Sequence, residues 1–67
     1  PNPVNDLLSI TSTGGTYTIN DLTGKTVANG PLQAGLTTIN TSLMSSGLYF
    51  IHITNINQQW TQKIIKQ

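Results

Sequence analysis

An all-β fold, an antiparallel β-sandwich of about six to seven short strands, is the class that this sequence predicts. Thr, Asn, Ser and Gln supply most of the polarity, and these residues suit the exposed faces of strands better than helices, where they are weak formers. Residues 48–53 form an apolar run that is rich in aromatic and β-branched residues and too short for a helix. Turn signals recur roughly every 8 to 12 residues, which favours a sandwich over an open sheet.

The run at residues 48–53 predicts the clearest strand, and it follows a chain break at Ser45, Ser46 and Gly47. Successive side chains of a strand point to opposite faces. The expected core face consists of Tyr49, Ile51 and Ile53. The opposite set, Leu48, Phe50 and His52, begins apolar and ends polar, which is typical of a strand whose outer face is partly covered by a loop or a partner.

Two strands are expected before residue 21. Residues 1–3 (Pro-Asn-Pro) predict an extended lead into a first strand at residues 7–12, because each proline fixes its own φ and biases the preceding residue away from helix. Gly14-Gly15 offers the positive φ values of a two-residue hairpin turn, and a second strand follows it. The expected inward residues are Leu8, Ile10, Tyr17 and Ile19, and Val4 is expected to anchor the start of the first strand.

Residues 21–25 (Asp-Leu-Thr-Gly-Lys) predict a type I turn closed by a glycine bulge. Asp21 can accept backbone N–H bonds in such a turn, so a structural role is favoured for it over a chemical one.

The middle of the chain predicts two short strands, at residues 25–29 and 36–40, with turns at Gly30-Pro31 and Ala34-Gly35 between them. Their expected core residues are Val27 and Ile39. Asn40 or Thr41 then caps one helical turn through Leu43, which leads the chain to Gly47.

Asn55 and Asn57 predict a tight reversal, since Asn tolerates left-handed backbone better than most residues. The last strand then covers residues 58–66. Neither of the two alternating sets of this strand is cleanly apolar, so the sequence does not decide which of its faces is buried.

Composition excludes several function classes. With 7% charged residues and a net charge of +1, the chain lacks the basic stripe that nucleic-acid binding requires. Zero cysteines exclude disulfides and thiolate metal sites. No apolar run approaches the length of a membrane helix, and no export leader opens the chain, so any leader is expected on a larger parent protein.

An enzyme is not expected, because only Asp6, Asp21 and His52 could act as acid, base or metal ligand near neutral pH. One histidine without cysteine cannot assemble a usual zinc site. The sequence also has no glycine-rich phosphate loop or nucleophile elbow. No catalytic residue, cofactor, metal or small-molecule substrate is therefore predicted.

Four motifs, taken in order, resemble the type A C-terminal sorting domain of the type IX (Por) secretion system. They are Pro1-Asn2-Pro3-Val4 with Leu8 and Ile10, the segment 19–25, Asn40-Thr41-Ser42-Leu43 leading to residues 47–51, and the basic end Lys63-Ile64-Ile65-Lys66. The likeness covers essentially the whole chain. It implies an immunoglobulin-like β-sandwich and a single domain, residues 1–67, at the end of a larger secreted parent.

The resemblance also implies a function, a route and partners. The domain is expected to direct its covalently linked upstream cargo from the periplasm through the type IX outer-membrane translocon to the cell surface or the medium. A sortase-like peptidase commonly removes such a domain at the surface.

The two motifs that carry over by position give the expected recognition residues, Gly47, Tyr49, Lys63, Ile65 and Lys66. For Tyr49 a place in the core is favoured over direct contact with a receptor, and for Gly47 a backbone role. Lysines at a strand end are usually solvated, and the resemblance alone raises a recognition role for Lys63 and Lys66.

A non-catalytic carbohydrate-binding or adhesive β-sandwich is the alternative. Trp60, Tyr17 and Phe50 would form a flat sugar-stacking platform if they were coplanar and exposed.

Overall fold

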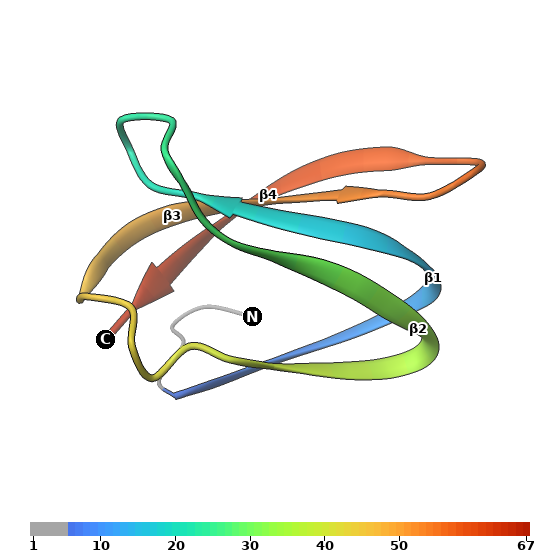
Figure 1. Cartoon of the computed structure of the whole chain (residues 1–67), viewed down its shortest axis with the longest axis horizontal. Coiled ribbons are helices and arrows are strands. Elements are labelled where there is room, and N and C mark those ends of the chain that lie inside the picture. Colours follow the sequence, from blue (N-terminus) through green and yellow to red (C-terminus); the bar gives the residue numbers. More distant parts are fainter. Residues whose placement is uncertain (1–5) are drawn as a thin grey trace.

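The computed structural model describes residues 6–67 as one antiparallel sheet of four strands in the order β2-β1-β3-β4 (Figure 1). The strands are β1 (Leu7–Asn20), β2 (Thr26–Asn40), β3 (Gly47–Thr54) and β4 (Gln59–Lys66). The all-β prediction is confirmed, and the predicted number of strands is wrong. The immunoglobulin-like sandwich stays a prediction, since these strands form a single sheet, and Val4 lies outside the described residues.

The strand count is wrong because the glycines expected to form turns lie inside β1 and β2. Gly14, Gly15 and Gly35 have φ values of 103°, 111° and 99°, yet all three lie within the strands, and the β1–β2 ladder pairs Gly15 with Leu32 and Gly35 with Ser12. Pro31 pairs with Thr16 within this ladder. Proline is tolerated there because β2 is an edge strand of the sheet. Two long strands thus replace four predicted short ones.

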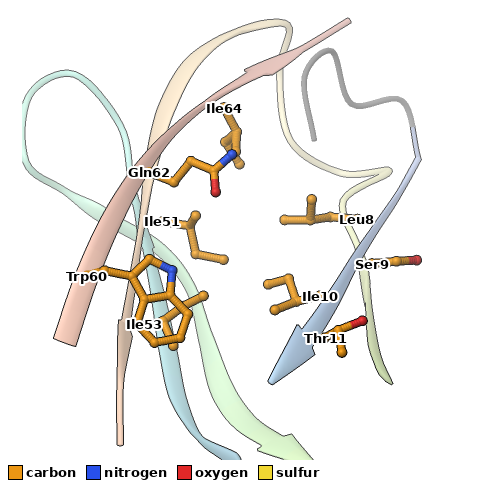
Figure 2. A pocket seen from close by; sticks show the side chains of 9 residues that line it. All are labelled: Leu8, Ser9, Ile10, Thr11, Ile51, Ile53, Trp60, Gln62 and Ile64. Carbon is orange, nitrogen blue, oxygen red and sulfur yellow. The ribbon is translucent and has the colours of Figure 1, made fainter. Parts of the chain in front are cut away.

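The long β1–β2 hairpin curls over the rest of the sheet. β3 pairs with β1 only at residues 16–20, so the first half of β1 leaves the four-stranded region. Figure 1 shows this half, in blue, passing beneath β3 and β4. Leu8 and Ile10 point from it toward the side chains of β3 and β4, across a cavity of about 200 Å³ (Figure 2).

The core fills the inside of this curl. Its buried apolar residues are Leu8, Ile19, Leu32, Ile39, Tyr49, Ile51, Ile53 and Ile64. The predicted core face of β3 is confirmed, and so are Leu8, Ile19 and Ile39, whereas Ile10 and Tyr17 are partly buried. Val27 is 39% exposed, so its predicted burial is wrong. A register shift between Ile19 and Asn20 pairs Asn20 with Thr26 and leaves Val27 out of the ladder.

The predicted turn between β1 and β2 is confirmed. The Gly24 amide donates to the Asp21 carbonyl over 3.1 Å, and Gly24 has a φ of 88°. Asp21 Oδ1 accepts bonds from the amides of Thr23 and Lys25, at 2.9 and 3.1 Å, and from the Thr23 hydroxyl at 2.6 Å. Asp21 therefore has the structural role that was favoured.

The two remaining connections each use an asparagine side chain. Asn55 Oδ1 accepts the amides of Asn57 and Gln58, at 2.9 and 2.8 Å, which confirms the reversal. No described non-glycine residue has positive φ, so the expected left-handed asparagine is wrong. Asn40 Oδ1 accepts the Ser42 amide over 2.9 Å, and this connection is a turn instead of the expected helical turn.

Candidate recognition site

The two motifs that the resemblance singles out lie side by side in the structure. Gly47 pairs with Lys66 and Tyr49 with Ile64, so the beginning of β3 lies against the end of β4. Figure 1 shows both at the same end of the sheet. Residues that are 15 and 19 positions apart in sequence thus form one local surface, because antiparallel pairing joins them. We call this region the paired end.

The inner side of the paired end belongs to the core. Tyr49 is 7% exposed, and its hydroxyl donates to the Ser45 carbonyl over 2.8 Å. Ile64 faces it from β4 at 1% exposure. Burial of an aromatic ring of this size contributes about 1.5 to 3 kcal/mol. The favoured place of Tyr49 in the core is confirmed.

Lys66 also lies on the inner side, which corrects the expectation of a solvated lysine there. Its residue is 6% exposed, Nζ donates to the carbonyl oxygen of Gln67 over 3.2 Å, and Nζ lies 3.7 Å from Oδ1 of Asp6. Strand alternation places Lys66 on the same face as Ile64, so its aliphatic stem is covered while its ammonium group reaches oxygen atoms at the edge. This resolves which face of β4 is buried.

The outer side of the paired end is exposed and largely apolar. Phe50 pairs with Lys63, and Leu48 pairs with Ile65. Phe50 and Ile65 are 37% and 43% exposed, Leu48 is half-buried and Lys63 is exposed. Phe50 was not among the predicted recognition residues. Its signal in the sequence was the apolar start of the outward set of β3.

Gly47 stands at the first position of β3 with a φ of 149°. A Cβ atom there would meet nothing within 4 Å, so space does not require glycine. The backbone conformation does, because L side chains rarely adopt it. This agrees with the backbone role that was favoured.

The titratable groups of the described chain do not converge on a reactive centre. Asp21 lies in the β1–β2 turn, where the hydrogen bond from the Thr23 hydroxyl and the amide bonds beside it lower the pKa of its carboxyl. Asp6 lies 3.7 Å from Lys66 Nζ, and His52 Nδ1 shares a 2.7 Å hydrogen bond with Thr61 Oγ1. Residues 6–67 hold no cluster of three His, Cys, Asp or Glu side chains that could bind a metal ion.

The three aromatic residues of the alternative platform do not share a face. Tyr17 and Trp60 both pair with Ile53, and they are partly buried against the core. Phe50 is on the opposite face of the sheet, which it shares with Lys63. A flat sugar-stacking surface formed by all three is therefore not present.

Comparison with known proteins gives one family. The model of the secretion system C-terminal sorting domain matches residues 1–67, and no curated protein or solved structure matches the chain. In the part of the chain that the structure describes, no helix has the length and apolarity to cross a membrane. The matched region includes both motifs of the paired end. The chain belongs to the family of secretion system C-terminal sorting domains, and it is a sorting signal for type IX secretion.

Proposed function

We propose that this domain is a non-catalytic sorting signal at the end of a larger secreted parent protein, and that the paired end is the part that the type IX secretion machinery recognises. The observation that carries the proposal is the pairing of Gly47 with Lys66 and of Leu48 with Ile65, which brings both family motifs onto one local surface. Such a surface exists only in a folded domain. The secretion machinery can therefore distinguish the folded sorting domain from unfolded cargo by this surface.

The route follows from this role. The parent protein is delivered to the periplasm. There the type IX outer-membrane translocon binds the sorting domain, to which the cargo is covalently attached. A sortase-like peptidase then separates cargo and domain at the cell surface. The described residues of the domain contribute a binding surface to these steps and no acid, base or nucleophile. We also propose that all 67 residues act as one unit, since the family match covers them all.

A reporter fusion tests the proposal. The reporter is placed upstream of Pro1 behind an ordinary export leader, and its distribution is measured in two isogenic hosts, with and without the type IX apparatus. The proposal predicts reporter at the surface or in the medium of the first host and periplasmic retention in the second. Equal distribution in both hosts would contradict it. Reporter with the leader but without the domain is the matched control.

A further inference from the structure

We propose that the docking surface is the outer strip, which we define as Leu48, Phe50, Lys63 and Ile65, and that it binds an apolar protein surface bearing carboxylates. This inference rests on the proposed function and deepens it. It assigns direct contact to one face of the paired end only. Tyr49 and the aliphatic stem of Lys66, on the other face, act by holding the β3–β4 pair in place.

The first argument is the position of the apolar residues. Leu48 lies directly opposite Ile65 on neighbouring strands, and Phe50 is two residues further along the same face. Opposite residues in an antiparallel pair have Cβ atoms about 4.5 to 5.5 Å apart, so these side chains form one continuous patch. Single exposed apolar residues are normal on a protein surface, whereas larger contiguous patches rimmed by polar residues mark interaction sites, so the contiguity of these side chains favours a binding role.

The second argument is charge. Lys63 is opposite Phe50, so a cation lies beside the aromatic ring of the strip. Further along this face, Asn20, Thr18 and Thr61 have neutral side chains, and the imidazole of His52 shares a 2.7 Å hydrogen bond with the Thr61 hydroxyl. The two carboxylates of the chain are placed elsewhere, because Asp21 lines a hollow with Tyr49 and Asp6 lies near Lys66. A partner with carboxylates around an apolar centre complements this arrangement.

The third argument separates the two lysines of the terminal motif. Lys66 is 6% exposed, so a partner could reach it only after the end of β4 had been displaced. Lys63 projects from the opposite face and is exposed. The structure thus gives these two residues different roles, although both belong to one short motif.

The experiment uses the same reporter fusion in the host that has the type IX apparatus. Phe50→Ser and Lys63→Glu alter the strip without opening the core. Loss of a central aromatic anchor or reversal of a contact charge is expected to lower the secreted fraction about tenfold or more. The matched controls are Leu36→Ser, at a residue that is 60% exposed on β2, and Lys25→Glu, in the β1–β2 turn. Both controls are expected to secrete like the unchanged fusion.

A third arm tests the division between faces. Lys66→Met keeps an unbranched stem of similar length without the charge, and it is expected to secrete within about twofold of the unchanged fusion. Circular dichroism of each domain variant verifies folding. Folded strip variants that secrete normally would overturn the inference, as would a folded Lys66→Met domain that is not secreted. If secretion of the unchanged fusion does not depend on the type IX apparatus, the proposed function is contradicted, and this inference, which rests on it, is contradicted as well.

Discussion

The two hairpins of the sheet share one pairing pattern and differ in what they contribute. β1 and β2 have 14 and 15 residues and contain Gly14, Gly15, Gly30 and Gly35. β3 and β4 have 8 residues each, and their only glycine is Gly47 at the start of β3. The long hairpin curls and closes the core, whereas the short one places residues 47–49 beside residues 63–66 at one end of the sheet. Under the proposed function, the long hairpin supports the fold and the short hairpin carries the recognised surface, and the two are joined where β1 pairs with β3.

The largest effect is expected where the long hairpin bends beneath the short one. A Cβ atom on Gly15 would lie 2.2 Å from the Thr54 carbonyl oxygen and 2.8 Å from Cβ of Asn55. Gly15→Ala therefore combines a clash with backbone strain, each of which costs about 1 to 3 kcal/mol. We expect a loss of about 3 to 5 kcal/mol, which is most of the stability of a domain this small. Urea unfolding followed by circular dichroism measures it.

Gly35→Ala is the matched control for that substitution. Gly35 also has positive φ, 99°, but a Cβ atom there meets nothing within 4 Å. Only the backbone strain remains, so the loss should be about 1 to 2 kcal/mol. Equal losses for the two variants would show that the contact between Gly15 and the β3–β4 turn does not hold the hairpins together.

Within the short hairpin, the largest effect is expected at Tyr49. Tyr49→Ala removes a buried aromatic ring from the core and should lower the free energy of unfolding by about 3 to 5 kcal/mol. Tyr49→Phe keeps the ring and loses only the hydrogen bond to the Ser45 carbonyl, which costs about 1 kcal/mol. Chemical denaturation of both variants gives the comparison. A Tyr49→Ala domain as stable as the unchanged one would place this side chain outside the core.

A smaller effect, visible only through pH, is expected at the turn of the long hairpin. The folded-state pKa of Asp21 is lowered, first by the hydrogen bond from the Thr23 hydroxyl. The stability that this carboxylate contributes is therefore fully present above its unfolded pKa, about 3.9, and is lost as the pH falls through the lower folded pKa. Melting temperatures measured between pH 2 and 6 should fall less steeply for Asp21→Asn than for the unchanged domain.

Thr23→Val sharpens this pH test, since it removes the hydroxyl donor and keeps the backbone amide that also bonds Asp21. Its slope should lie between those of the other two domains. Identical slopes for all three would mean that the turn carboxylate does not couple folding to pH.

Much of the fold could be predicted from local pattern, because alternation and turn chemistry act over a few residues. Tyr49, Ile51 and Ile53 were placed in the core by alternation alone, and Asp21 was placed in its turn by the glycine that follows it. The extent of the long strands could not be predicted this way. A Gly-Gly pair allows a hairpin or a bend equally well, and the choice at Gly14-Gly15 depends on a ladder to residues about 20 positions away.

The candidate site shows the same limit. The motifs at the beginning of β3 and the end of β4 were both recognised from the sequence. The buried face of β4 could not be assigned, because both of its alternating sets mix apolar and polar residues: one contains Gln62 and Lys66, and the other contains Lys63 and Ile65. The face of Lys66 depends on the register with β3, which pairs it with Gly47 and places Ile64 over the core. Register is a property of two strands, and no single-strand pattern contains it.

The most direct test of the central claim is the secreted fraction of the reporter fused to the Gly15→Ala domain, measured against the Gly35→Ala fusion in the host with the type IX apparatus. Both variants keep every residue of both motifs. Only Gly15→Ala disrupts the contact between the long hairpin and the β3–β4 turn of the short hairpin. If the folded paired end is the sorting signal, secretion is lost for Gly15→Ala and kept for Gly35→Ala. Full secretion of an unfolded Gly15→Ala fusion would show that the linear motifs suffice, and the account would be contradicted.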